Sequence, residues 1–522
     1  MQEIVLDPDD VAFLYYAFSR IFVILLFYFV VKAVFKIVGL DLYFGRFEIG
    51  TLFFKSLFGM LRFFFMILVY PFKLLLSVLN LFSSNSGFLP FSERIFFLNR
   101  FNDGLLLDGR NSRVTKRVSY EHLALIARTG GGKTSSYIIP NIFTVDNASI
   151  VVTDLSGELF EKTSGYMHKK GFYIEVLNLS DIKNSLRYNP LYYANSSEEI
   201  SELSHVLIKS ANPVVTADGH YWLNGAEQIL NILISCLKRT GKEEYANLVN
   251  LRYLLNNFGS DGRRLDRFIA RYATDPVFYE WRGFSDSGNA KVTQTFVSTA
   301  INSLKALSNE SLALLTAKNS INFEILRKKK TIFYLIVPQE KLEFYSFLLN
   351  IFYTQLFSFL MKERNPANLP VYLLLDEFGH LAIPNFSTII TTIRKYRVSI
   401  SILLQSVTQL EKQYGKADAN TILSGGIGSK IFYSGADLET TVMLEKILGV
   451  VKRGGREEKV MTLDKIRTMK SNRAIYIYSN KKPVLLKIRP YYKSFRFKRY
   501  ASLEPFKIQN SFDESLKYVD LD

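Results

Sequence analysis

The chain has 522 residues, enough for about three domains, and it carries a formal charge of +17. This surplus of Lys and Arg indicates a polyanionic partner, either nucleic acid or an anionic membrane face, although solubility alone accounts for part of it. A single cysteine, Cys236, excludes an intramolecular disulfide, and the five scattered histidines show no recognisable metal-binding spacing.

Residues 1–82 hold two stretches dense in Phe, Leu, Ile and Val, at about 11–40 and 52–82. Each stretch is long enough to cross a bilayer core of about 30 Å. We therefore expect a membrane anchor of two transmembrane helices. The alternative is one span followed by an amphipathic helix in the interface, because Pro71 and Lys73 interrupt the second stretch. The acidic N-terminus without a small-residue cleavage site is not typical of a signal peptide.

Residues 83–118 are rich in turn signals and predict a polar linker into the rest of the chain. A glycine-rich loop, ARTGGGKTSS, follows at Ala127–Ser136, between an apolar strand at His122–Ile126 and a helical pattern. Strand, glycine loop and helix form the context of a nucleotide-binding P-loop, whose open backbone N–H groups surround phosphates. Ala127 stands at the first glycine position of the usual motif and must adopt an ordinary backbone conformation.

The P-loop predicts binding of ATP and Mg²⁺. Lys133 is placed to reach the β and γ phosphates, and the Thr134 hydroxyl is placed to bind Mg²⁺. The residues expected to contact nucleotide are Thr129, Gly130, Gly131, Gly132, Lys133, Thr134 and Ser135. Because ATP is cytoplasmic, everything after Phe82 must be cytoplasmic. With two spans, the basic loop between them would then lie outside, in conflict with the positive-inside rule.

Apolar strands alternate with helical patterns after the P-loop, and this alternation predicts a parallel α/β sheet. From Ser196 to Ser320 no strand is evident, whereas amphipathic helices are expected at 198–209, 223–237, 245–257, 265–272 and 292–314. We predict a RecA-like nucleotide-binding domain at 119–194 and 321–500, an all-helical domain inserted at 195–320, and a C-terminal tail at 501–522. The expected strands are 122–126, 149–152, 172–176, 331–337, 371–375, 399–404, 430–433, 474–478 and 484–488.

The strand at 371–375 ends in two carboxylates, Asp376 and Glu377. In a P-loop ATPase this position faces the phosphates from a neighbouring strand. Asp376 is expected to hold Mg²⁺, and Glu377 is expected to act as general base on the attacking water. Such a pair occurs often by chance, but with the upstream P-loop it predicts nucleotide hydrolysis.

The strand at 398–404 is flanked by further candidate catalytic residues. Gln405 follows it, and its amide could hydrogen-bond the γ-phosphate or the lytic water, or be an ordinary strand-end residue. Arg394 and Arg397 precede it. Arg394 could reach the nucleotide of a neighbouring subunit, where such arginines raise rates about 10³–10⁵-fold, or it could be a surface charge.

Six segments together resemble the TraG/TraD-type coupling proteins of type IV secretion and conjugation. The most specific are VYLLLDEFGHLAIPNF, SISILLQSVTQLEKQYG and KIFYSGADLETTVMLEKILG, which follow ARTGGGKTSSYIIPNI, SIVVTDLSGELFEKTSGY and RYNPL in the same order. The resemblance covers about residues 123–492 and the two N-terminal stretches. One departure is Asp154-Leu-Ser-Gly-Glu158, where the family commonly has Asp-Pro-Lys-Gly-Glu.

The resemblance implies a homohexameric ATPase anchored in the bacterial inner membrane, with its ATPase domain in the cytoplasm. Its implied partners are single-stranded DNA bound to a relaxase, other relaxosome proteins and the components of a type IV secretion channel. The all-helical domain would correspond to the family domain that contacts substrate. Two alternatives remain open: an FtsK-type DNA translocase, and a membrane receptor whose nucleotide binding gates docking of protein effectors.

Two basic segments are candidates for direct DNA contact. The segment 451–460, which carries four Lys or Arg residues, could line a central pore or be a solvated loop. The segment 487–500 interleaves basic and aromatic residues in a pattern compatible with single-stranded nucleic acid, although its first part alternates like an edge strand.

Overall fold

The computed structural model describes residues 87–212, 219–259, 262–285, 290–453, 456–508 and 515–521. The two hydrophobic stretches at 11–40 and 52–82 lie outside the described residues. The described chain divides into two compact units. The smaller contains residues 87–99, 449–460 and 482–484, and the larger contains the rest.

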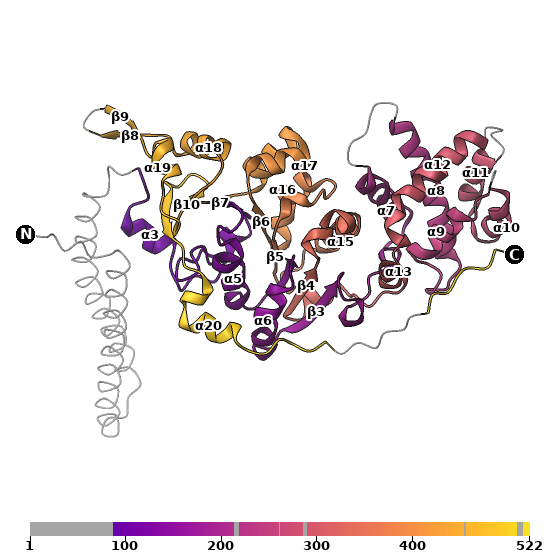
Figure 1. The fold of residues 1–522 in the computed structure, drawn as a ribbon, viewed down its shortest axis with the longest axis horizontal. Helices are drawn as coiled ribbons and strands as arrows, with labels where there is room; N and C mark the ends of the chain where they lie inside the picture. The colour runs from indigo at the N-terminus through magenta and orange to yellow at the C-terminus, as the bar shows by residue number, and fades with distance from the viewer. Residues whose placement is uncertain are drawn as a thin grey trace, which may run out of the picture. The chain divides into compact units, whose positions relative to one another are not determined.

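A nine-stranded sheet is the centre of the larger unit, in the order β11-β10-β7-β1-β6-β5-β2-β4-β3 (Figure 1). The strands from β7 to β3 pair in parallel, and β10 runs antiparallel to β7. Every strand expected from the sequence is present and the α/β class is confirmed, but the predicted parallel sheet is mixed, because β10 runs antiparallel to β7. The strands are β1 Leu123–Ile126, β2 Ser149–Asp154, β3 Tyr173–Asn178, β4 Thr331–Ile336, β5 Val371–Leu375, β6 Val398–Leu404, β7 Ser429–Tyr433, β10 Arg473–Tyr478 and β11 Val484–Lys487.

The central strands are apolar because both of their faces are covered. Every residue of β1, β2, β4, β5 and β6 is buried. Helices pack around the sheet (Figure 1), as is usual for parallel strands. They include α5 Ile139–Thr144, α6 Glu158–Lys169, α15 Leu342–Lys362, α16 Phe386–Thr392, α17 Val407–Asn420, α18 Leu438–Leu448 and α19 Leu463–Arg467.

Helix α15 is a core helix. With its 3₁₀ lead-in it covers Gln339–Lys362, and among the described residues it alone has the length and apolar composition to cross a membrane. Its apolar window is 67% buried. Burial of that degree accounts for its composition without a bilayer.

The region after η3 (Pro190–Tyr193) is helical, as the sequence predicts. Helix α8, Gly219–Arg239, contacts each of the helices around it (Figure 1). These are α7 Ser197–Ala211, α9 Leu248–Asn256, α10 Arg263–Tyr272, α11 Asp275–Ser285 and α12 Ala290–Ser303. The sequence indicates one helix over 292–314, but a 3₁₀ turn, Lys305–Ser308, separates α12 from α13 Glu310–Ala317. Asn309 causes the break, because its side chain accepts from Leu312 N (3.0 Å) and caps α13.

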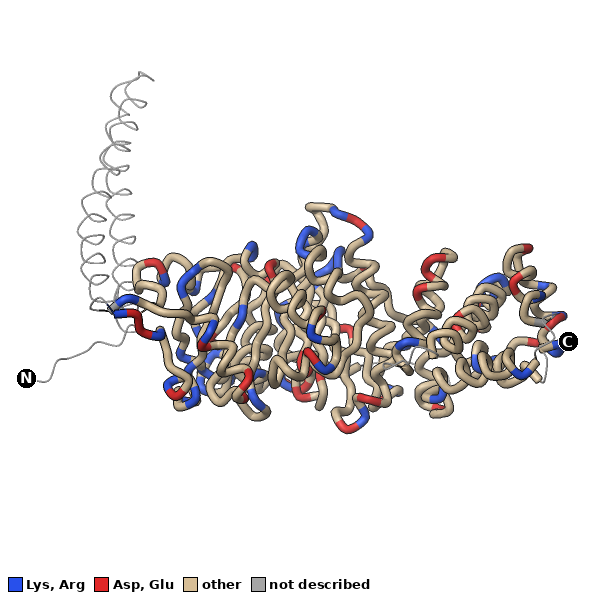
Figure 2. Tube along the Cα trace, turned by 90° about the horizontal axis from the view of Figure 1, so that it is seen from above, with Lys and Arg blue, Asp and Glu red and all other residues tan. Residues whose placement is uncertain are grey.

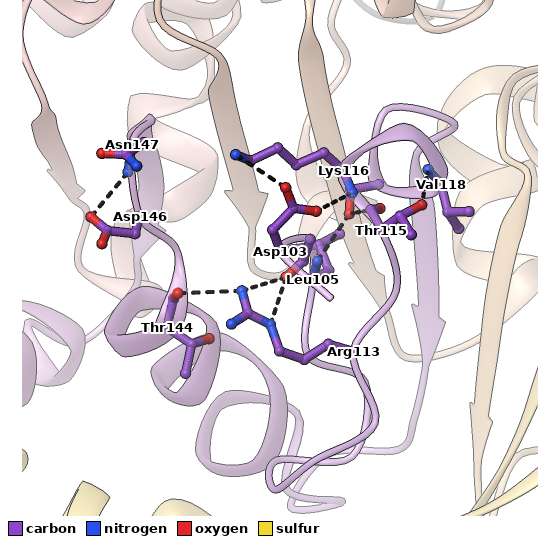
Figure 3. A network of polar contacts seen from close by, with 11 residues as sticks. Asp103, Leu105, Arg113, Thr115, Lys116, Val118, Thr144, Asp146 and Asn147 are labelled. Atoms are coloured by element: carbon purple, nitrogen blue, oxygen red, sulfur yellow. Dashed lines mark hydrogen bonds and ion pairs between the residues drawn. The ribbon is translucent and has the colours of Figure 1, made fainter. Parts of the chain in front are cut away.

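The chain at 100–118 packs into the larger unit, which its interpretation as a polar linker did not anticipate. Leu105, Leu106 and Leu107 are buried. The amide of the fully buried Asn141, on α5, donates to Leu106 O (2.8 Å) and accepts from Leu106 N (2.8 Å). Arg113 donates to Gly104 O (2.8 Å) and Thr144 O (3.3 Å), so it joins this segment to the end of the same helix (Figure 3).

The smaller unit contains α3 Phe91–Phe97 and an antiparallel hairpin, β8 Val450–Arg453 with β9 Arg456–Lys459. Leu89 N donates to Pro483 O (2.8 Å) within this unit. The hairpin lies in the basic segment 451–460, and all of β9 is exposed. A role in a central pore stays a prediction.

Two aromatic rings of the segment 487–500, those of Phe497 and Tyr500, stack on the protein itself, whereas Tyr492 (54% exposed) and Phe495 (86% exposed) lie at the surface. Helix α20, Phe495–Ala501, packs against α6. The rings of Tyr500 and Tyr166 stack with centroids 3.8 Å apart, and Phe497 lies 5.8 Å from Phe143. The rings of Phe497 and Tyr500 pack within the larger unit, whereas the basic side chains of α20 that lie at the surface are available to a polyanion.

Candidate nucleotide-binding site

The P-loop follows directly from β1. Ala127 continues the strand direction, because Ala127 N donates to Leu404 O of β6 (3.0 Å). This extended, fully buried position explains why alanine replaces the first glycine of the motif. The turn comes later, at Gly130 and Gly132, which have φ of +72° and +84°. Only glycine adopts such angles readily.

The loop has the shape that a phosphate group requires. Thr129 and Gly130 are exposed, and Gly131, Gly132, Thr134 and Ser135 are half-buried. A Cβ on Gly131 would lie 2.9 Å from Arg128 O, so this turn has no room for a side chain. The first helical turn, η1 Thr134–Ile138, starts at the loop and continues as α5. Backbone N–H groups at such a helix start favour an anion.

Lys133, Glu377 and Gln405 form one connected group at the carboxyl edge of the sheet. Lys133 Nζ lies 3.1 Å from Glu377 Oε1, and Gln405 Nε2 donates to Glu377 Oε2 (3.0 Å). The Lys133 side chain is 6% exposed and that of Glu377 is 12% exposed, so the pair is largely shielded from water. The three side chains come from β1, β5 and β6 and their following turns, as the sequence predicts.

Asp376 and Thr134 lie together beside this group and fit a magnesium ion. Thr134 Oγ1 donates to Asp376 Oδ2 (3.1 Å). Both are oxygen donors, which Mg²⁺ prefers, and one carboxylate plus phosphate oxygens is its usual ligand set. Burial raises the pKa of Asp376 to about 6, and the neighbouring Glu377 carboxylate adds to the rise. A bound Mg²⁺ would favour the ionised carboxylate and neutralise charge on the phosphates.

Glu377 has an unusual backbone conformation. Its φ is +53° and its ψ is +41°, in the left-handed region that residues other than glycine, asparagine and aspartate seldom adopt. The strain of such a residue is held by its surroundings, here the β5 strand before it and the buried Phe378 after it. Backbone strain at a carboxylate that contacts the P-loop lysine supports a functional role for that carboxylate.

Gln409 and Gly379 complete the site, and the sequence analysis missed both. Gln409 Oε1 accepts from Gln405 N (3.1 Å), which fixes the backbone that carries the catalytic candidate Gln405. A Cβ on Gly379 would lie 2.2 Å from Gln409 Cδ, so Gly379 makes the space for this side chain. The signal was present as Ser406-x-x-Gln409, a capping-box spacing in which Ser406 Oγ accepts from Gln409 N (3.2 Å).

Arg394 does not lie at the site of its own chain. It is exposed in η7, Ile393–Tyr396, which precedes β6, whereas Gln405 follows β6. The seven residues of β6 separate the two ends by about 23 Å. Arg397 has a structural role, because its guanidinium donates to Asn368 O (3.0 Å). Arg394 therefore lies too far from the P-loop to contact a nucleotide bound to its own chain, and a role in trans stays a prediction.

Asp154, in the segment that departs from the resembled pattern, caps a helix. Its Oδ2 accepts from Phe160 N (2.8 Å) at the start of α6, and its Oδ1 accepts from Ser156 N (3.3 Å). Burial raises the pKa of this carboxyl. The Pro and Lys of the common pattern are absent, yet the turn between β2 and α6 is retained through Asp154.

Comparison with known proteins gives matches in sequence and in fold. Residues 99–459 match the family model described as type IV secretory system conjugative DNA transfer. The chain is 26% identical over 341 residues to protein VirD4 of Rhizobium radiobacter and over 340 residues to VirD4 of Agrobacterium fabrum. These alignments cover 63% of this chain, which spans about half the length of these curated relatives (48% and 49%).

The fold resembles that of the bacterial conjugative coupling protein TrwB. A sulphate complex of TrwBdeltaN70 superposes with a TM-score of 0.63 at 15% identity, covering 79% of this chain and 95% of that one. A TrwB complex with ADP and Mg²⁺ gives a TM-score of 0.60 at 16% identity, with the same coverage of both chains. The family match covers more than half of the sequence and the fold agrees with it. The chain therefore belongs to the type IV secretory system conjugative DNA transfer family.

Proposed function

We propose that this chain is an ATP-hydrolysing coupling protein that receives a relaxase-bound DNA substrate and delivers it to a type IV secretion channel. The observation that carries the proposal is the convergence of Lys133, Glu377 and Gln405, from three strands, next to a phosphate-binding loop. Family membership supports DNA as the substrate, and the existence of a TrwB complex with ADP and Mg²⁺ supports nucleotide and magnesium as ligands.

The proposed hydrolysis uses the chain's own side chains in distinct roles. The P-loop backbone orients the phosphates, and Lys133 supplies a positive charge close to the reacting group. Glu377 accepts the proton of the attacking water as general base. Gln405, hydrogen-bonded to Glu377 Oε2 (3.0 Å), orients that carboxylate and can exchange this bond for one to the γ-phosphate. Thr134 and Asp376 would hold Mg²⁺, which would supply Lewis-acid charge stabilisation.

Completion of this site requires a neighbouring subunit. Arg394 is exposed at the start of β6, at the opposite end of that strand from Gln405. An assembly in which Arg394 of one subunit faces the P-loop of the next subunit would supply an arginine in trans. Such a head-to-tail contact forms a ring when the rotation between subunits closes, and we propose that it closes as a homohexamer. Nucleotide turnover would then depend on assembly.

We further propose that residues 1–82 anchor the chain in the bacterial inner membrane, with the ATPase domain in the cytoplasm. The support is the composition of the two hydrophobic stretches. The remaining proposed partners are relaxosome proteins and channel components. Among the alternatives, an FtsK-type translocase gains no support from the family match. Measuring the affinity for DNA and its salt dependence would distinguish a nucleotide-gated receptor for protein effectors from a coupling protein.

The test is the steady-state ATPase rate of the detergent-solubilised full chain, with and without single-stranded DNA. Lys133→Ala and Glu377→Gln are expected to abolish DNA-stimulated turnover while the circular dichroism spectrum is retained. Lys162→Ala is the matched control, because Lys162 pairs with Glu161 at the surface of α6 and should not affect the rate. Retained turnover in Glu377→Gln would overturn the assignment of the general base.

A further inference from the structure

The C-terminal segment, residues 515–521, docks on the all-helical domain. Leu516 packs against a small apolar cluster of Val249, Ala313 and Ala317, from α9 and α13. Val519 is 4% exposed. Residues near a terminus are usually poorly ordered unless contacts hold them, so these buried apolar side chains indicate a docked segment.

One asparagine fixes the position of this segment. Asn250, fully buried on α9, donates from Nδ2 to Lys517 O (3.0 Å) and accepts at Oδ1 from Val519 N (2.8 Å). A side-chain amide that satisfies a C=O and an N–H two residues apart imitates the edge of a neighbouring β-strand. Lys517 Nζ also pairs with Glu244 Oε2 (2.8 Å), but this pair is exposed and contributes little.

The chain before this segment is fixed to the nucleotide-binding fold. Phe506 N donates to Ser164 Oγ of α6 (3.0 Å), and the Phe506 ring lies 4.8 Å from the His168 ring. A Cβ on Gly165 would lie 2.0 Å from Glu504 O, which shows how closely the chain passes over this helix. The C-terminal residues therefore connect α6, which follows β2 of the sheet, with α9 of the all-helical domain.

The C-terminal segment ends beside a row of arginines on α10. Arg264, Arg267 and Arg271, here named the α10 arginines, are exposed and recur every three or four residues, so they share one face of this helix. Arg267 and Arg271 line a cavity of about 260 Å³ together with Tyr272, Asp520 and Leu521. Figure 1 shows α10 next to the C-terminus, and Figure 2 shows Lys and Arg segments there.

We propose that the α10 arginines bind the phosphate backbone of DNA, and that the C-terminal segment is an intramolecular competitor that places the Asp520 carboxylate in that surface. Arginine is suited to this role, because its planar guanidinium pairs bidentately with phosphate. Arg271 also lies over the Tyr272 ring (5.9 Å), beside which a base can stack.

This surface differs from the nucleotide site, and its competitor regulates access of DNA rather than hydrolysis. The docked segment, residues 515–521, is short, and its contacts include one buried asparagine and a few apolar side chains, so docking is readily reversed. The choice of DNA as the polyanion rests on the proposed function, whereas docking of the C-terminal segment does not.

The test is the affinity of the full chain for fluorescent single-stranded DNA, measured by anisotropy over a range of salt concentrations. Three variants release the competitor in different ways: deletion of 515–522, Asn250→Ala and Asp520→Asn. If the segment covers the surface about nine-tenths of the time, deletion raises the apparent affinity about 10-fold. Replacing Arg267 and Arg271 by Gln in the deletion variant should remove this gain and lower the slope of log affinity against log salt by about 1.4.

The controls separate the possible failures. Arg239→Gln removes an exposed arginine of the same domain and should leave the gain intact, and Asn257→Ala serves as the matched control for Asn250→Ala. Hydrogen exchange reports docking directly, since release should deprotect the Val519 amide. An unchanged DNA affinity after deletion, or a gain in affinity that survives the double arginine change, would contradict the proposal that the C-terminal segment competes with DNA. Absence of DNA binding in every variant would instead contradict the proposed function, and with it the assigned polyanion.

Discussion

Lys133 and Glu377 lie 244 residues apart in the chain, yet their side-chain nitrogen and oxygen meet at 3.1 Å in a largely buried ion pair. Gln405 holds the other carboxylate oxygen of Glu377 at 3.0 Å. Removal of one partner from such a pair leaves an uncompensated charge, which is costly. Glu377, the proposed general base, is oriented from two sides, by a cation and by a neutral amide.

Gln405→Ala should lower the ATPase kcat about 10–100-fold and leave nucleotide affinity within about 3-fold, because the amide orients Glu377 rather than the phosphate loop. Fluorescent-nucleotide titration and steady-state kinetics give the two numbers. The exposed Gln228 on α8 is a matched control as Gln228→Ala. Loss of nucleotide affinity without loss of kcat would place Gln405 in binding instead of positioning.

Gly379→Ala should destabilise the site, because the new Cβ would lie 2.2 Å from Gln409 Cδ. We expect a lower melting temperature and reduced turnover. Gln409→Ala removes the obstructing side chain, so the double variant should melt higher than the sum of the two single changes predicts, with a coupling of about 0.5–3 kcal/mol. Strictly additive effects would show that Gly379 and Gln409 do not share this space.

Asn141→Ala should destabilise the larger unit by about 2–4 kcal/mol, since it leaves buried backbone groups of Leu106 without their partner. Chemical denaturation followed by tryptophan fluorescence measures the change. Asn184→Ala, at an exposed turn, is the control. An effect no larger than that of the control would mean that residues 100–118 do not support the P-loop helix.

Glu175 should make stability depend on pH. Burial on β3 raises the pKa of its carboxyl from 4.5 to about 7. Between pH 4.5 and about 7 the folded state then binds more protons than the unfolded state. The stability contributed by protonated Glu175 is therefore lost as the pH rises from about 4.5 through 7. Glu175→Gln should raise the melting temperature relative to the unchanged protein at pH 8 and have little effect at pH 5. The same gain at both pH values would exclude ionisation of Glu175 as the cause.

The strands and the principal site residues could be predicted from the sequence because their signals are local. Each central strand is an apolar run, since helices cover both faces of the sheet, and Lys133, Asp376 and Gln405 directly follow the turns or strands that place them. Parallel strands bring their carboxyl ends to one edge. The resemblance to coupling proteins rested on the same segments and is confirmed by the family match.

Other features depend on contacts that no local pattern reveals. Residues 100–118 have the composition of a linker, and only tertiary contacts, such as the hydrogen bonds of the buried Asn141 amide, show that they belong to the core. The aromatic rings of Phe497 and Tyr500 resemble base-stacking residues in sequence, yet they stack on α5 and α6. Docking of the C-terminal segment depends on Asn250, which is separated from Val519 by 269 residues.

The most direct test of the account is the ATPase rate of the full chain at increasing protein concentration, with and without single-stranded DNA. We predict a rate per subunit that rises steeply with concentration, is stimulated by DNA and is lost in Arg394→Ala. Mixing Arg394→Ala with Lys133→Ala should restore part of it, because some interfaces then combine an intact P-loop with an intact arginine. A rate that is indifferent to DNA and independent of concentration, and that survives Arg394→Ala, would contradict a DNA-coupled site shared between subunits.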